Sequence, residues 1–185
     1  MQTIKSISLF AIFILPFLIN GCDTLNKLPI NVPVTFNFQM SGAGLSQTRV
    51  ICMDEADSYL DYKGDIKKLS LLRIIYRTNA SENSVLPENI QGFFQILIKR
   101  NDTKEVLIDK QVPNLKPIDY RKPHLPYELL LTSDETALVN MYLNENINEN
   151  PCFEGTVTLL NITGGSPPYY LNGHVDVLIE AEVEF

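Results

Sequence analysis

Residues 175–185 alternate between apolar and polar side chains, and this pattern constrains the fold more than any other in the chain. One side carries Val175, Val177, Ile179, Ala181, Val183 and Phe185, and the other carries Asp176, Leu178, Glu180, Glu182 and Glu184. A period of two indicates a β-strand with one face in an apolar core and the other towards water. The chain therefore has to supply partner strands.

Shorter patterns of the same kind predict those partners. Val32, Val34, Phe36, Phe38 and Met40 alternate with polar residues or proline in residues 32–40. Further strands are predicted at residues 48–53, 66–78, 92–100, 105–112 and 153–163. The sequence Asn101-Asp102-Thr103-Lys104 predicts a hairpin turn between two of them.

The connections carry one helix. Thr132 and Glu135 have capping-box spacing, which predicts a helix over residues 133–145. Its predicted apolar face consists of Ala137, Leu138, Met141 and Tyr142. The polar residues 54–65 are expected to form a connection, and four prolines between residues 113 and 126 exclude a central strand or a helix there.

Seven or eight short strands and a single short helix, without a βαβ rhythm, predict a mainly β protein. We expect an antiparallel β-sandwich, Ig-like or fibronectin III-like, with a small closed barrel as the alternative.

The first 22 residues have the zones of a secretory signal. Lys5 is followed by the apolar run 9–19, then by Asn20, Gly21 and Cys22. The apolar run is shorter than the roughly 20 residues that a membrane-spanning helix needs. Its ending, a small residue and then a cysteine, resembles the lipobox of bacterial lipoproteins.

This resemblance implies cleavage before Cys22 and attachment of lipid to its thiol. Residues 1–21 are then a signal peptide, residues 22–31 a lipidated tether and residues 32–185 one sandwich domain. The expected location is the bacterial cell envelope, anchored by lipid and facing the periplasm or the exterior. Asp23 resembles an inner-membrane retention signal of enterobacteria, but other bacterial groups sort differently, so both membranes stay open.

The charge of the chain excludes one class of partner. Its net charge is −7, and removal of residues 1–21, which hold one lysine and no acid, makes it −8. An acidic protein lacks the positive charge that binding to nucleic acid requires.

Cys52 and Cys152 remain once Cys22 is modified. An even pair in an oxidising compartment is a candidate disulfide, and two buried thiols are the alternative.

Catalytic motifs and metal or cofactor sites are not predicted. His124 and His174 lack ligand spacing, and the acidic run 54–65 lacks the order of a calcium loop, so a solvated acidic loop is the favoured interpretation. The candidate binding residues are loop aromatics, Tyr59, Tyr62, Tyr169 and Tyr170, whose alternative role is packing over the ends of the core.

The expected function is that of a non-catalytic binding or structural module. Its loops or an exposed strand edge would engage another envelope protein or a polymer. The alternatives are an envelope hydrolase or metal-dependent enzyme, and a small-ligand carrier with a pocket between the sheets.

Overall fold

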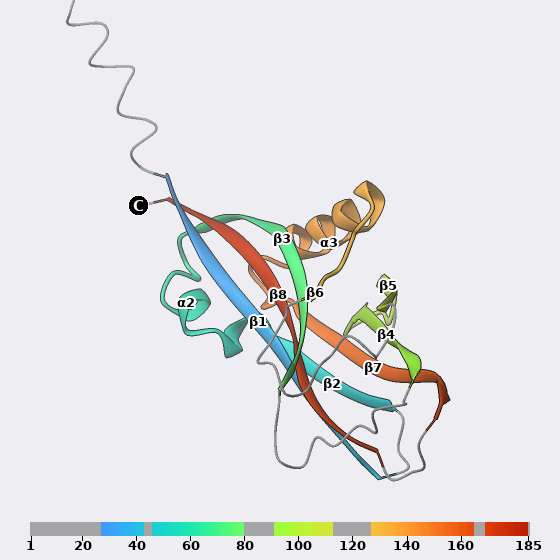
Figure 1. Cartoon of the computed structure of the whole chain (residues 1–185). Helices are drawn as coiled ribbons and strands as arrows, with labels where there is room; N and C mark the ends of the chain where they lie inside the picture. Colours follow the sequence, from blue (N-terminus) through green and yellow to red (C-terminus); the bar gives the residue numbers. More distant parts are fainter. Residues whose placement is uncertain (1–26, 43–45, 80–90, 113–126, 165–168, 185) are drawn as a thin grey trace, which may run out of the picture.

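The computed structural model describes residues 27–42, 46–79, 91–112, 127–164 and 169–184. They form two four-stranded antiparallel sheets packed face to face, which confirms the predicted β-sandwich (Figure 1). The strands are β1 (Lys27–Gly42), β2 (Ser46–Cys52), β3 (Ile66–Asn79), β4 (Gln91–Arg100), β5 (Val106–Val112), β6 (Tyr127–Glu128), β7 (Cys152–Thr163) and β8 (Tyr169–Glu184). The helices are η1 (Met53–Glu55), α2 (Asp57–Leu60) and α3 (Ser133–Glu145).

The strand order defines the architecture within the sandwich class. One sheet has the order β1-β8-β3-β6 and the other the order β2-β7-β4-β5, and we call them the β1 sheet and the β2 sheet. Only β4 and β5 are neighbours both in sequence and in a sheet, so nearly every connection crosses between the two layers. This is the order of an eight-stranded jelly roll, whereas the immunoglobulin order places the first two strands side by side in one sheet.

The core lies between the sheets and follows the predicted alternation. Inward residues of β1 and β8, such as Val32, Phe36 and Ile179, are buried. The rings of Phe38, Tyr76 and Phe94 pack together at 5.0 to 6.4 Å between centroids and join the two layers.

The first strand starts earlier than the sequence predicted. β1 begins at Lys27 and its residues 27–31 pair with Glu184 to Glu180 of β8, so half of the expected tether 22–31 belongs to the sheet. The start of β1 and the end of β8 therefore lie at the same corner of the molecule (Figure 1).

Pro29 and Pro33 are on β1, an edge strand, and pairing with β8 runs unbroken past both. Their missing N–H groups therefore fall on the outer edge, where they hinder pairing with another strand.

The predicted helix is confirmed as α3, with the capping box formed. The Thr132 hydroxyl accepts a hydrogen bond from the Glu135 N–H at 3.2 Å, and the Glu135 carboxylate accepts one from the Thr132 N–H at 2.7 Å. The predicted apolar face is correct for Tyr142, which is buried, and for Leu138, which packs against the core. It is wrong for Ala137 and Met141, which are exposed, and Val139 and Leu143 are buried in their place.

Polar residues of α3 explain why the helix buries a different face from the predicted one. Asn140 and Asn144 accept hydrogen bonds from the backbone N–H groups of Leu71 and Leu69 in β3, at 2.7 and 3.0 Å. The short strand β6 pairs only with Ile75 and Tyr76 of β3, so α3 covers the part of this edge that β6 leaves open.

Candidate functional site

The two candidate disulfide cysteines lie directly opposite each other in the β2 sheet. Cys52 ends β2 and Cys152 begins β7, and a bond of 1.99 Å joins their sulfur atoms. The disulfide closes a loop with a sequence separation of 100 and has a structural role.

Tyr59 is corrected from a binding-loop aromatic to a core residue. It sits in the single turn α2, inside the segment predicted as a polar connection, and its side chain is fully buried. Its hydroxyl donates a hydrogen bond to the Ile147 carbonyl at 3.2 Å. Burial, with a further contribution from the Asp54 carboxylate, raises the pKa of Tyr59.

The other three tyrosines divide into two cases. Tyr62 is half-buried and packs against the core. Tyr169 and Tyr170 do not lie in a loop, because their backbone opens β8 and pairs with Gly42 and Ser41. Their side chains fall outside the described residues, as do Cys22, His124 and the proline-rich connection.

His174 belongs to a polar group on the outer face of the β1 sheet. Its Nε2 lies 3.5 Å from the Asp176 carboxylate, which also accepts a hydrogen bond from the Thr35 hydroxyl at 2.9 Å. The Arg77 Nε lies 3.5 Å from the same carboxylate. The group ties β1, β8 and β3 together.

Arg100 has three ion-pair partners among the described residues and also stabilises the fold. Its guanidinium lies over the Tyr142 ring at 4.8 Å and within ion-pair distance of Asp102, Glu105 and Glu145. Its hydrogen bond with Asp102 raises the pKa of Arg100 and lowers that of Asp102. These contacts join the β4–β5 hairpin to the end of α3.

The described ranges contain neither a metal-binding group of side chains nor a membrane-spanning helix. No group of three or more His, Cys, Asp or Glu side chains there is arranged to hold a metal ion. No helix among these residues is both long and apolar enough to cross a membrane.

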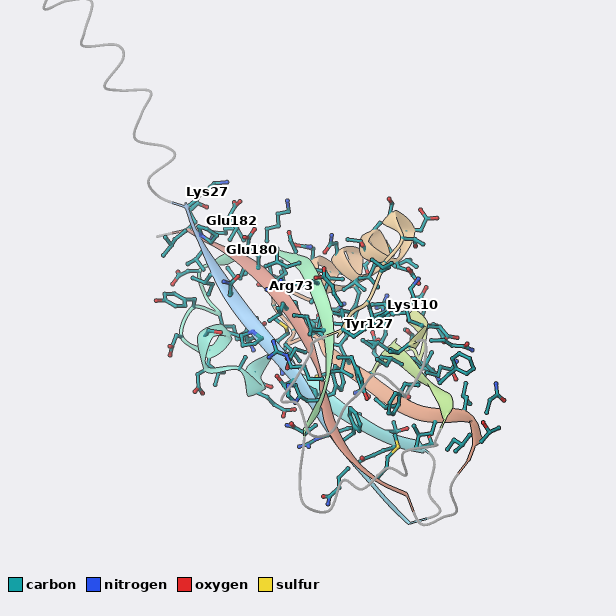
Figure 2. The ribbon with its side chains drawn as sticks, in the orientation of Figure 1. Lys27, Arg73, Lys110, Tyr127, Glu180 and Glu182 are labelled. Atoms are coloured by element: carbon teal, nitrogen blue, oxygen red, sulfur yellow. A yellow bond between two sulfur atoms is a disulfide. The ribbon has the colours of Figure 1, made fainter. Side chains whose placement is uncertain are left out.

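The outer faces of the two sheets differ in charge. The β1 sheet presents a charged face, four of whose residues are labelled in Figure 2. It consists of Lys27, Lys68, Arg73, Arg77, Glu128, Asp176, Glu180, Glu182 and Glu184. Lys27 and Glu182 pair at 2.7 Å, and this hydrogen bond raises the pKa of Lys27 and lowers that of Glu182.

The β2 sheet presents a face that is largely uncharged, and we call its nearly uncharged part the neutral platform. The platform ends at the row formed by Val50, Glu154 and Lys99, where Glu154 pairs with Lys104 at 2.7 Å. It consists of Ser46 and Thr48 of β2, Thr156, Thr158 and Leu160 of β7, Phe93, Gln95 and Leu97 of β4, and Asp109 and Gln111 of β5. The helices lie away from the platform: α2 packs mainly on β1 and η1, and α3 packs mainly on β3 and the edge strand β5. Tyr142 of α3 also contacts Arg100 and Phe153, neither of which belongs to the platform. All ten side chains retain exposure to solvent.

The platform side chains are linked in rows across the strands. The hydroxyls of Ser46 and Thr158 hydrogen-bond at 2.8 Å, and so do those of Thr48 and Thr156. The Gln95 amide donates to Asp109, the one charged member, at 2.7 Å. Sequence reasoning missed this surface, although serine, threonine and glutamine at outward positions of several strands were its signal.

The comparisons with known proteins give no family. No family model and no curated protein sequence matches the chain. Similar solved structures include those of turnip yellow mosaic virus (TM-score 0.35, covering 85% of this chain and 96% of that one) and Desmodium yellow mottle tymovirus (0.33, 85% and 90%). A structure of tobacco necrosis virus has a TM-score of 0.32, covering 84% of this chain and 97% of that one. All three are 8% identical in sequence, and likeness at this level bears on neither family nor function.

Proposed function

We propose that this protein is a non-catalytic binding module of the bacterial cell envelope, held on a membrane by lipid on Cys22. The proposal rests on the signal-like residues 1–22 and on one structural observation, the start of β1 at Lys27. The five residues from Cys22 to Lys27 can span at most about 18 Å at roughly 3.6 Å per residue. An anchored domain would therefore be held close to the bilayer.

The way in which β1 is held in the fold also suits an anchored protein. All sixteen residues of β1 pair with β8, and β8 pairs in turn with β3. A pull on the N-terminus would therefore act on the full length of a core sheet. The prolines on the outer edge of β1 make the exposed faces better candidates for a partner than this edge.

The anchor is tested by expressing the chain in bacteria supplied with labelled palmitate. The wild type is expected to incorporate the label and to sediment with membranes, whereas Cys22→Ser does neither. The double variant Cys52→Ser/Cys152→Ser is the matched control, since it loses two cysteines and keeps the anchor. Equal labelling of Cys22→Ser and wild type would overturn the proposal.

One observation favours the small-ligand carrier as a second candidate. The Tyr76 hydroxyl is buried between the sheets without a hydrogen-bond partner among the described residues, and burial raises its pKa well above the ordinary value. A bound polar ligand atom would satisfy this hydroxyl.

The substitution Tyr76→Phe distinguishes a core that binds a small ligand from a core that holds none. For an empty core we expect the variant to be more stable by about 1 to 3 kcal/mol in urea unfolding, because the unsatisfied hydroxyl is removed. For a carrier, native mass spectrometry of the wild type would show a copurified small molecule that Tyr76→Phe binds less well.

A further inference from the structure

The neutral platform has few charges although the chain as a whole is acidic. The protein has a net charge of −7, and the opposite face of the same sandwich is crowded with charges of both signs. Asp109 is the only charged platform residue, and the Gln95 amide hydrogen-bonds to it. A ligand that depends on ion pairs would find little to bind here, whereas an uncharged ligand would meet no unpaired charge to desolvate.

Hydrogen bonds hold the polar groups of the platform in place before any ligand binds. In each hydroxyl pair, Ser46–Thr158 and Thr48–Thr156, one hydroxyl donates to the other. Each pair thus keeps one free O–H donor and several acceptor lone pairs that can face a ligand. Because the pairs sit on paired strands of a sheet, binding requires little ordering of loops or long side chains.

Apolar groups lie beside this hydroxyl network. Phe93 is 38% exposed and pairs across the strands with Leu160, and Leu97 lies four residues further along β4. At about 4.8 Å between strands and 3.3 Å per residue, the platform measures roughly 14 Å on a side. An aromatic ring beside hydroxyl and amide groups suits a ligand with both C–H faces and hydroxyl groups, which is the chemistry of a sugar.

We infer that the neutral platform binds an uncharged polysaccharide. A protein partner is disfavoured because protein interfaces are enriched in aromatic residues, methionine and arginine, and serine and threonine are rare among their strongest contacts. The platform contains one aromatic residue and no arginine or methionine. Nucleic acid is disfavoured because the platform holds no lysine or arginine, and Lys99 and Lys104 at its border lie beside the carboxylate of Glu154.

This inference deepens the proposed function, since a lipid-anchored domain with this surface would hold a glycan near a membrane. The test does not depend on the anchor. It uses the purified full chain in a detergent without a sugar headgroup, so a negative result would leave the labelling of Cys22 unaffected. Loss of the anchor would likewise leave glycan binding intact.

The experiment is affinity electrophoresis in native gels that contain mannan, dextran, xyloglucan or, as an acidic comparison, alginate. We expect at least one of the three uncharged polysaccharides to retard the wild type. Phe93→Ala and the double variant Thr156→Val/Thr158→Val should each weaken this binding about tenfold or more, which corresponds to the loss of about 1.4 kcal/mol.

Matched controls lie on the opposite face. Leu72→Ala and Asn37→Ala change exposed residues of the β1 sheet and should bind as the wild type does. The valine variants keep the β-branched shape of threonine, so all variants should retain the wild-type melting temperature. Retardation by none of the polysaccharides, retardation by alginate alone, or unchanged binding of the platform variants would each overturn the inference.

Discussion

At the scale of single residues, two glycines determine where the large core rings can lie. The Phe38 ring covers Gly173, its partner on the neighbouring strand β8, and the Phe36 ring lies over Gly155 of the opposite sheet. A Cβ atom built at either glycine would come within 2.4 Å of a ring carbon. The sequence shows that Phe36 and Phe38 face a core, but the glycines that accept their rings become evident only from the strand register.

Gly173→Ala should therefore destabilise the protein. Its Cβ would lie 2.4 Å from Phe38 Cζ and 2.5 Å from the Arg77 carbonyl oxygen, and the backbone atom cannot move aside as a flexible side chain could. Overpacking of this kind costs about 1 to 3 kcal/mol, which urea unfolding would measure. Gly64→Ala is the control, because nothing lies within 4 Å of its added Cβ, and it should change stability by no more than about 0.5 kcal/mol. Equal effects of the two substitutions would contradict this packing argument.

At the scale of elements, α3 covers the edge of β3 and forms hydrogen bonds with its backbone, as a further strand would. Its bounds were predicted correctly because the capping box and the length of the periodic segment are local signals. Its buried face was predicted only in part, for Leu138 and Tyr142, because we expected an apolar stripe that packs on the face of a sheet. A helix that covers a sheet edge must also satisfy backbone N–H and C=O groups, so Asn140 and Asn144 point towards β3.

Asn144→Ala should open this edge. The Asn144 side chain pairs with both the N–H and the carbonyl of Leu69, at 3.0 and 2.7 Å, so its loss leaves two backbone groups without partners. We expect a loss of stability of about 1 to 3 kcal/mol and faster hydrogen exchange at the Leu69 amide. Met141→Ala, an exposed change on the same helix, should leave both quantities near the wild-type values. Unchanged exchange at Leu69 in Asn144→Ala would show that this hydrogen-bonded contact does not protect the edge.

The cap of α3 gives the protein a pH-dependent contribution to stability. Burial would raise the pKa of Glu135, but hydrogen bonds from Lys110 and Thr132 outweigh it and lower the pKa below the ordinary 4.5. The folded state thus binds this proton less readily than the unfolded state. The stabilisation is fully present above about pH 4.5 and is lost as the pH falls through the lowered pKa.

Glu135→Gln isolates this charge, because glutamine can still cap the helix. In urea unfolding between about pH 3 and about pH 7, the stability advantage of the wild type should be largest near neutrality and should shrink below about pH 4.5. Lys110→Gln should weaken the same dependence, since Lys110 Nζ lies 2.7 Å from the Glu135 carboxylate. A wild-type advantage that stays constant over this range would contradict the assignment.

At the scale of the whole molecule, the class of fold was predictable and the order of strands was not. Alternation in residues 32–40 and 175–185 shows which side chains enter a core, so two covered sheets follow from it. The same alternation does not say which strands are neighbours, because every half-buried strand offers the same kind of edge. The neutral platform was missed for the same reason, since its members come together only through the order β2-β7-β4-β5.

The disulfide is the one covalent link across this non-local topology. Cys52 and Cys152 have a sequence separation of 100, and the loop that they close contains β3 to β6 and α3. In the chain-entropy account, a crosslink that closes about 100 residues restricts the unfolded chain and stabilises the fold by roughly 4.7 kcal/mol. We therefore expect the double variant Cys52→Ser/Cys152→Ser to unfold at a much lower urea concentration than the oxidised wild type. The reduced wild type should match the double variant, because both have lost the crosslink and keep the same core. A double variant as stable as the oxidised protein would mean that the strand pairing of β2 with β7 alone restricts the chain as strongly as the covalent bond does.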